Sequence, residues 1–412
     1  MVTNSPTHLS VSAPDVNLAT QPLKISIIAS DLSKSGAGRW KGAVRPFLLA
    51  QALQLLGHQV EILGFANDGE GLPSESDLPI KVFEQATYPC FFGNALELMR
   101  HIEGDVVLAY KLKPSSFGLA LLYKLRKRCP VILDIDDWEL SWHGGDDWKY
   151  PGSVVQMARD ILKPNGAMRS PDYPMYLKWI EKLTHKADAI TLHTTFMQQR
   201  FGGHYVPNGK DMAMFDPTLY DPQLSRDRYN LTGYKVLMFP GAPRPYKGVE
   251  DVLQALDLLG QEDMRLVIVG GSPYDRYDDY LISKWGKWII HLPKQPYTQM
   301  PEVVSAAHVL MVPQRDNPAA KAQFPLKLTD GMAMAKPILA SKVGDIARIL
   351  GETGYLVEPN SPEQIADKLS NIFQDLDAAN LRGKSARERC LKHYSIEAMA
   401  ENLQKIIADI PT

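Results

Sequence analysis

Short runs of apolar residues alternate along this chain with longer stretches in which apolar residues recur every three or four positions. In the first half, the runs predict strands at 24–30, 60–65, 106–111, 131–136 and 189–195, and the stretches predict helices at 45–58, 115–128 and 174–186. Runs that are apolar throughout are typical of a parallel sheet covered on both faces. The alternation therefore predicts βαβ units and an α/β fold.

The alternation stops within 206–234, which is rich in Pro, Asp, Asn and Gly, and then begins again. The second half is expected to contain strands at 235–242, 265–271, 289–293, 308–313, 336–341 and 354–359, and helices at 249–259, 298–307, 326–335 and 396–410. A further helix is expected after Ser361 as N-cap, with Pro362 in its first turn and Gln364 completing a capping box.

The chain is thus expected to hold two Rossmann-like domains that face each other across a cleft. We expect a disordered tail at 1–22, an N-terminal domain at 23–210, a linker at 211–234, a C-terminal domain at 235–395, and at 396–412 a helix that packs back on the N-terminal domain. Ligands of open α/β sheets bind at the carboxyl ends of the strands, so the cleft is the expected site.

Composition narrows the classes of function. The chain has 412 residues, enough for two domains, and its formal net charge of −2 gives no reason to expect a nucleic-acid partner. Cys90, Cys129 and Cys390 match neither a disulfide framework nor metal-ligand spacing, so we expect inert or buried thiols in a reducing cytosol. No apolar run approaches the ~20 residues of a membrane span, and the first residues do not resemble a secretory signal.

The first candidate site is the stretch 239–256, where a strand is expected to end at Gly241 and a helix to begin after Gly248. Arg244 and Lys247 lie in the loop between them. Two cations beside the free N–H groups of a helix N-terminus suit a diphosphate. The alternative is two solvated loop cations. Gly270, at the end of the next expected strand, is a further candidate.

The second candidate is the stretch 324–341, in which Pro325 can open a helix. The N–H groups of Leu326 and Lys327 would then be free to face an anion. Asp330 lies one turn further on and can accept hydrogen bonds from a ribose diol. The alternative is an aspartate that only balances the helix dipole.

Two loops of the first half are weaker candidates. Gly36 and Gly38 follow the first strand and permit close approach of a phosphate or a sugar, although an ordinary turn explains them equally. The stretch 134–150 combines acids with Trp138, Trp142 and Trp148, which suits either a carbohydrate or a lid that packs on its own domain. Its spacing does not match a metal site.

Two further features each allow two interpretations. His193 ends an expected strand and either faces the cleft or is structural. The stretch 121–128 is basic on one side, which indicates a solvated helix face or contact with an anionic membrane surface.

The order and spacing of "VPNG" (206–209), "GAPRPYKGVEDVLQAL" (241–256), "RLVIVGG" (265–271) and "FPLKLTDGMAMAKPILAS" (324–341) resemble the GT-B glycosyltransferases of retaining family 4. The resemblance covers 24–410 and is strongest between 235 and 375. It implies that Arg244 and Lys247 bind the diphosphate and that Asp330 binds the ribose. The donor-binding set implied is Gly36, Gly38, Gly241, Gly248, Gly270, Leu326, Lys327 and Asp330.

Two departures from the family pattern concern carboxylates. The family has two glutamates separated by seven residues, whereas here the second is Asp330 and the first falls on Ala322. The family often shows a His-Asp pair after its fourth main strand, where this chain has Asp136 and Asp137. Asp136 is carried over as a residue of the cleft.

We expect a cytoplasmic enzyme, and contact with the inner membrane face is an open alternative. The C-terminal donor domain would supply a sugar from a nucleotide diphosphate sugar to a hydroxyl acceptor, a carbohydrate or lipid-linked glycan, on the N-terminal acceptor domain. Configuration would be retained, with Arg244, Lys247 and Asp136 as the catalytic residues. No metal and no cofactor besides the donor co-substrate is expected. The alternatives are a non-catalytic sugar-nucleotide-binding protein and a sugar-nucleotide epimerase.

Overall fold

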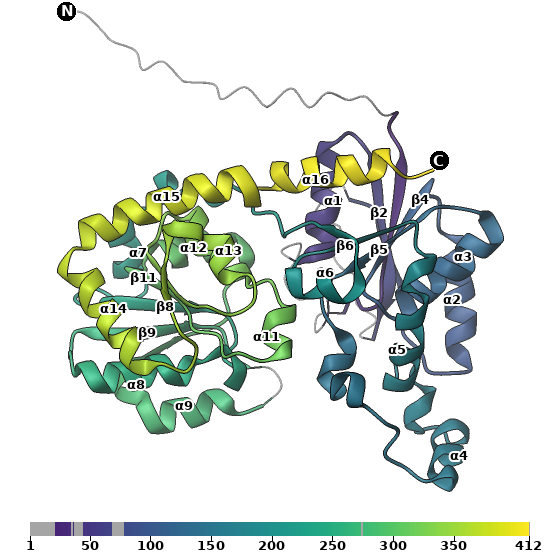
Figure 1. Cartoon of the computed structure of the whole chain (residues 1–412), viewed down its shortest axis with the longest axis horizontal. Helices are drawn as coiled ribbons and strands as arrows, with labels where there is room; N and C mark the ends of the chain where they lie inside the picture. Colours follow the sequence, from purple (N-terminus) through teal and green to yellow (C-terminus); the bar gives the residue numbers. More distant parts are fainter. Residues whose placement is uncertain (1–20, 34–35, 37–43, 68–77, 273–274, 412) are drawn as a thin grey trace, which may run out of the picture.

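A computed structural model describes residues 21–33, 36, 44–67, 78–272 and 275–411 (Figure 1). Gly38, one of the predicted donor-binding glycines, lies outside these residues. The described part forms two α/β domains, each built on a parallel sheet, which confirms the predicted fold class. None of the described helices is long and apolar enough to cross a membrane.

The sheet of the N-terminal domain has seven strands in the order β3-β2-β1-β4-β5-β6-β7. The strands are β1 (Lys24–Ala29), β2 (Gln59–Ala66), β3 (Ile80–Glu84), β4 (Val106–Tyr110), β5 (Val131–Ile135), β6 (Ala189–Leu192) and β7 (His204–Tyr205). The helices are α1 (Arg45–Leu55), α2 (Cys90–Arg100), α3 (Leu119–Lys127), α4 (Val154–Leu162), α5 (Pro174–Ile180) and α6 (Thr195–Phe201). The central strands are almost wholly buried, as their apolar runs predict.

The sheet of the C-terminal domain has six strands in the order β10-β9-β8-β11-β12-β13. They are β8 (Lys235–Pro240), β9 (Met264–Val269), β10 (Ile289–Leu292), β11 (Val309–Val312), β12 (Ile338–Ser341) and β13 (Tyr355–Val357). The helices are α8 (Val249–Leu259), α9 (Tyr277–Trp285), α10 (Met300–Ser305), α11 (Pro318–Ala322), α12 (Leu326–Ala333), α13 (Ile346–Leu350) and α14 (Pro362–Gln374). This strand order is that of a Rossmann fold.

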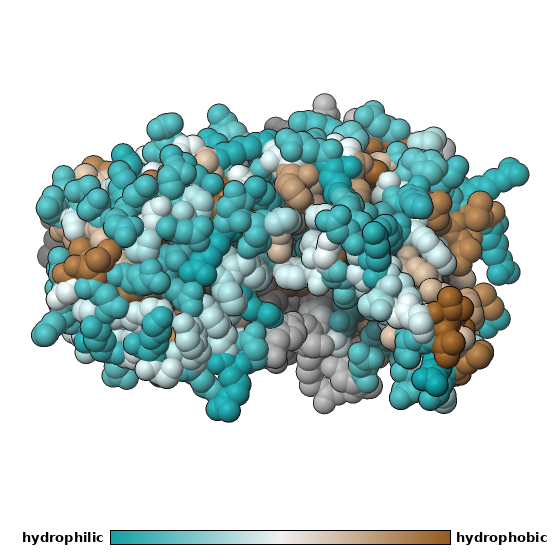
Figure 2. Space-filling view, turned by 60° about the horizontal axis from the view of Figure 1, so that its bottom comes forward, coloured by the Kyte–Doolittle hydropathy of each residue, from teal (hydrophilic) through white to brown (hydrophobic). Residues whose placement is uncertain are grey.

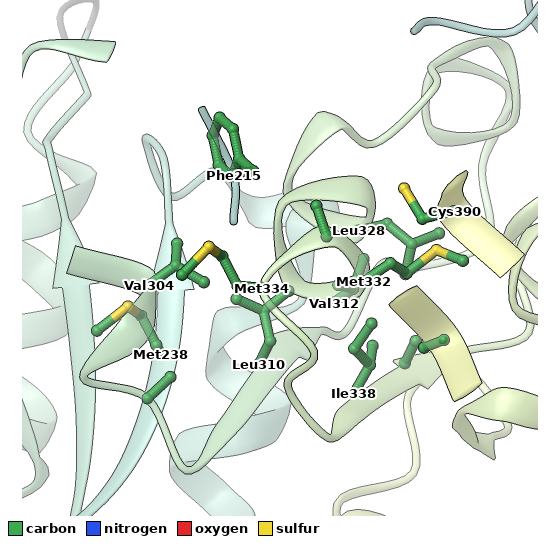
Figure 3. Packing of buried hydrophobic residues seen from close by; sticks show 14 of the residues in the cluster. Phe215, Met238, Val304, Leu310, Val312, Leu328, Met332, Met334, Ile338 and Cys390 are labelled. Carbon is green, nitrogen blue, oxygen red and sulfur yellow. The ribbon is translucent and has the colours of Figure 1, made fainter. Parts of the chain in front are cut away.

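Two details differ from the sequence expectations. Ser361 makes no side-chain cap at α14; its hydroxyl donates to the Pro359 carbonyl, and Gln364 instead accepts from the N–H of Glu358. The segment 211–234 is not irregular throughout, because it contains α7 (Pro222–Arg228), and its Phe215 is buried in the core of the C-terminal domain. Figure 3 shows Phe215 among the side chains of this core.

The cysteines differ in exposure. Cys390 is buried among the side chains of Figure 3, and Cys129 is buried in the N-terminal domain. Cys90 is exposed at the start of α2, so burial accounts for two of the three cysteines, and the inertness of the third stays a prediction.

The chain passes between the two domains twice, first after Lys210 and again between α15 and α16. The helix α15 (Leu376–Tyr394) lies on the C-terminal domain, and α16 (Ile396–Ala408) continues across to pack its apolar face against α1 (Figure 1). The returning chain meets the outgoing one at Lys210, whose N–H donates to Tyr394 O at 2.7 Å and whose carbonyl accepts from Ile396 N at 3.1 Å. Both passages between the domains are therefore bonded to each other.

Candidate functional site

A cavity of about 240 Å³ opens at the carboxyl ends of β8, β9 and β11, where ligands of such sheets bind. Its charged lining consists of four lysines and one aspartate, which favours an anionic ligand. The described lining residues are Lys210, Pro240, Gly241, Lys247, Val269, Lys294, Gln295, Tyr297, Met300, Gln314, Gln323, Phe324, Pro325, Leu326, Lys327 and Asp330.

The loop between β8 and α8 brings one of the two predicted cations to this cavity. Lys247 lines it, and its Nζ donates to the carbonyl of Ala242 at 2.9 Å. Arg244 lies at the start of the same loop, with its Nη1 3.8 Å from Asp275 Oδ2 and its side chain 28% exposed. The guanidinium thus belongs to the same loop as Lys247 but lies outside the lining of the cavity.

The turn at Gly248 fixes the conformation of this loop. Gly248 has a φ of +67°, and a Cβ atom there would lie 1.7 Å from the carbonyl oxygen of Pro313. Only glycine allows this approach, so the residue holds Lys247 in place between β11 and the start of α8.

The N-terminus of α12 forms the opposite wall. Pro325 is its N-cap and supplies no side-chain cap, which leaves the first N–H groups of the helix at the cavity beside Leu326 and Lys327. The Lys327 ammonium lies 3.5 Å from the centre of the Phe239 ring. Burial lowers the pKa of Lys327 well below its usual value, and the nearby Lys247 lowers it further. A bound anion would relieve this unfavourable burial of charge.

Asp330, predicted to bind the ribose, lines the cavity, and its carboxylate is already paired. Lys210 Nζ contacts Asp330 Oδ1, and the same ammonium lies 4.4 Å from the centre of the Phe215 ring. Burial alone would lower the pKa of Lys210, but the charge and hydrogen bond of Asp330, together with Tyr297, outweigh burial and raise the pKa above its ordinary value. Lys210 was not among the predicted site residues, since it lies at the end of the N-terminal domain, 120 positions from its partner.

The remaining predicted glycines differ in their surroundings. Gly241 lines the cavity with a φ of +120°, and a Cβ atom there would have no described atom within 4 Å, so its role is to turn the chain. Gly270 has a φ of +92° and its carbonyl accepts from His291 Nε2, outside the cavity lining. Gly36 lies in a turn against Asp31, also outside the lining.

Asp136 lies at the end of β5 in a second group of charges. Its carboxylate accepts from the Tyr110 hydroxyl and lies 3.4 Å from Lys111 Nζ. Burial raises the pKa of the adjacent Asp137 to about 7, and the charges of Glu139 and Asp136 add to the effect. This group belongs to the N-terminal domain and is outside the lining of the cavity.

The tryptophans of this stretch contact different parts of the molecule. Trp138 is buried in its own domain and Trp148 packs on Tyr173. The Trp142 ring lies 6.1 Å, centre to centre, from the ring of Tyr246 in the loop between β8 and α8. This part of the stretch therefore contacts the cation-bearing loop directly.

His193 is a structural residue of the domain interface. Its Nε2 donates to the carbonyl of Ala322 at 3.3 Å, and its Nδ1 accepts from Asn208 at 3.4 Å. Burial, and then the charge of Arg45, lower its pKa to about 3. The neutral imidazole thus links the N-terminal domain to Ala322, the position that holds the first glutamate of the family pattern.

A buried ion pair fixes the "VPNG" segment, 206–209, which leads into the passage between the domains. Arg45 binds both carboxylate oxygens of Asp134 at 2.7 Å and donates to Val206 O and Asn208 Oδ1 at 2.9 Å.

Among the described residues, no group of three His, Cys, Asp or Glu side chains is arranged to hold a metal ion.

Two Rossmann-like domains in contact, with a cation-lined cavity in the second, are the architecture of the GT-B fold, to which the similar solved glycosyltransferases belong. Residues 234–375 match the family model of glycosyl transferases group 1. The C-terminal half thus carries a group 1 glycosyltransferase domain, and the chain as a whole is similar to enzymes of this family.

Relatives and solved structures agree with this class. The D-inositol 3-phosphate glycosyltransferase of Corynebacterium glutamicum is 24% identical over 93% of this chain and 96% of its own length. Anabaena HepE, solved with UDP and glucose, has a TM-score of 0.71 at 14% identity over 94% of this chain and 99% of its own. A glycosyltransferase from Rickettsia africae gives a TM-score of 0.70 at 17% identity, over 95% and 99% of the two chains.

Proposed function

We propose that this enzyme transfers a sugar from a nucleoside diphosphate sugar to a hydroxyl acceptor, a carbohydrate or a lipid-linked glycan, with retention of configuration. The observation that carries the proposal is the gathering of Lys247, Lys327 and the open N-terminus of α12 around one cavity. Asp330 is the one carboxylate among the described lining residues and is already paired with Lys210, so the unbalanced charge is positive. A diphosphate supplies the missing negative charge.

The chemistry follows from where these charges lie. The bond between the anomeric carbon and the donor phosphate breaks through an oxocarbenium-like state, and negative charge builds on the leaving diphosphate. The acceptor oxygen forms the new bond to the anomeric carbon, and its proton passes to the leaving diphosphate. Lys247, Arg244 and the N–H groups of α12 stabilise that charge, so the enzyme lowers the barrier mainly by electrostatic stabilisation of the leaving group. Because the protein provides these cations, we propose that neither a metal nor a further cofactor takes part.

The proposed roles divide between the two domains. Asp330 and Lys210 hold the ribose, while Asp136 contributes to the acceptor side. The solved complexes of Anabaena HepE with UDP and with UDP-glucose support a nucleotide sugar as donor. The related D-inositol 3-phosphate glycosyltransferase supports transfer to a hydroxyl group.

The test is a transfer assay with a panel of nucleotide sugars and sugar acceptors in the presence of EDTA, with the anomeric configuration of the product read by NMR. We expect acceptor-dependent release of one nucleoside diphosphate and a product of the donor's configuration. Conversion of the donor without an acceptor would indicate an epimerase instead, and loss of turnover in EDTA would refute metal independence.

A further inference from the structure

The helix α4 presents its apolar side chains to the solvent. Val154, Val155 and Leu162 are 83%, 65% and 77% exposed, Ile161 is 50% exposed, and none of the nine residues of the helix is buried. The helix projects from the lower end of the N-terminal domain in Figure 1. Figure 2 shows hydrophobic side chains gathered on the end of the molecule that carries this domain.

The helix α4 contacts the rest of the protein along one flank, where Met157 and Asp160 are half-buried. Asp160 accepts hydrogen bonds from the Tyr150 hydroxyl at 2.7 Å and from Gln156 at 2.8 Å, and the Ser153 side chain caps the first turn. At Gly166 the chain turns so close to α4 that a Cβ atom would lie 2.1 Å from the Asp160 carbonyl oxygen. A surface helix ordinarily buries its apolar stripe, whereas α4 leaves Val154, Val155, Ile161 and Leu162 in the solvent.

The charges around the apolar side chains are positive. On α4 and the residue that follows it, the exposed charged side chains are Arg159 and Lys163, whereas the one acid, Asp160, is half-buried and accepts from Tyr150. A short helix with an outward apolar face and a basic rim matches the interface of an anionic bilayer.

We propose that α4 docks the N-terminal domain on an anionic membrane surface, with Val154, Val155, Ile161 and Leu162 entering the region between headgroups and acyl chains. A helix of nine residues is only about 13 Å long. It is therefore too small to supply the ~800 Å² per partner of a stable protein–protein interface. Insertion to a depth of ~5–10 Å needs no larger surface. The proposed docking involves α4 only, so the proposal does not depend on which donor the enzyme uses.

Flotation with lipid vesicles tests the proposal on the full-length protein. We expect binding to vesicles of phosphatidylcholine with phosphatidylglycerol, and much weaker binding to phosphatidylcholine alone. Leu162→Glu and Val155→Glu should each lower the partition coefficient about tenfold or more, because a carboxylate would enter the interface. Arg159→Gln combined with Lys163→Gln should weaken binding and reduce its dependence on salt.

The matched control is Leu258→Glu on α8, since Leu258 is also an exposed leucine, at 61%, but lies in the other domain. It should bind vesicles like the wild type, and all variants should keep the wild-type melting temperature. Equal binding by wild type and Leu162→Glu would overturn the proposal, as would no binding by the wild type. A dimer in solution that Leu162→Glu dissociates would also overturn it, in favour of a second copy of the chain.

Discussion

The ammonium of Lys210 contacts the carboxylate of Asp330 inside the cavity, although the two residues lie 120 positions apart. The backbone of Lys210 is bonded to Tyr394 and Ile396 where the two domain passages meet. Lys210 therefore connects the two passages of the chain between the domains with Asp330, the carboxylate that we assign to the ribose. A change in the angle between the domains would act on the cavity through this residue.

Replacing Asp330 by Asn should destabilise the protein and weaken donor binding together. The substitution leaves the Lys210 ammonium, whose side chain is 3% exposed, without its charge partner. Loss of one member of a buried pair costs about 3–5 kcal/mol, measurable by urea denaturation. Combining Lys210→Met with Asp330→Asn should recover part of this loss, because no unpaired charge is then buried. Strictly additive effects in this double-mutant cycle would contradict the pairing.

Lys247→Ala should lower kcat about 10²–10³-fold, as expected when one charge that stabilises a leaving group is removed. Arg244→Ala should act in the same direction. Arg276→Ala is the matched control, because this arginine is 92% exposed and pairs with its neighbour Asp279. Steady-state kinetics with the donor saturating give the measurement. If both Lys247→Ala and Arg244→Ala kept the wild-type kcat, the assigned roles would be wrong.

Gly248→Ala should destabilise the protein far more than Gly260→Ala. Both glycines have left-handed backbones, with φ of +67° and +59°, but only Gly248 has a backbone carbonyl 1.7 Å from the new methyl group. Gly260→Ala should cost about 1 kcal/mol for its backbone conformation alone. Gly248→Ala should cost about 3 kcal/mol, since a backbone oxygen cannot rotate away. Equal midpoints of thermal unfolding would contradict this account of the loop.

The low pKa of His193 predicts that the folded protein loses stability in mild acid. Its pKa in the folded protein is about 3, below the ordinary value of 6.5. Between these values the unfolded chain binds a proton that the folded protein does not, so stability falls as the pH falls, by up to about 1.4 kcal/mol per pH unit. His308, with a pKa of about 4, adds to the same trend.

The variant His193→Gln removes one of these protons while keeping a donor for the Ala322 carbonyl. The free energy of unfolding, measured from pH 7 to pH 5, should then fall less steeply than in the wild type. His101→Gln is the control, because this histidine is exposed at the end of α2. An unchanged slope in His193→Gln would show that the imidazole is not held neutral by burial.

The sequence predicted the parts of the fold that follow from local pattern. Fully apolar runs identify the central strands, and α8 begins and ends as its apolar stripe and Gly260 indicate. The strand β3 was missed because its sequence, IKVFE, is polar at two of five positions and only partly buried at the edge of the sheet. The capping box at Ser361 was wrong because its hydroxyl and the Gln364 amide have other partners.

The site was predictable where its groups lie on one loop or one helix turn. The loop with Lys247 and the turn with Lys327 and Asp330 both reach the cavity. Lys210 was not predictable, because its contact with Asp330 depends on how the two domain passages cross. The exposed apolar side of α4 was not predictable for a related reason: the direction of an apolar stripe depends on contacts such as that of Asp160 with Tyr150.

Titration calorimetry of nucleoside diphosphates in EDTA tests the central claim, that the lysine-lined cavity binds the diphosphate of the donor. We predict one molecule of one nucleoside diphosphate bound per chain, about tenfold or more weaker in Lys247→Ala, with Leu258→Glu indistinguishable from the wild type. Absence of binding by every nucleoside diphosphate, or equal affinity in Lys247→Ala, would contradict the assignment.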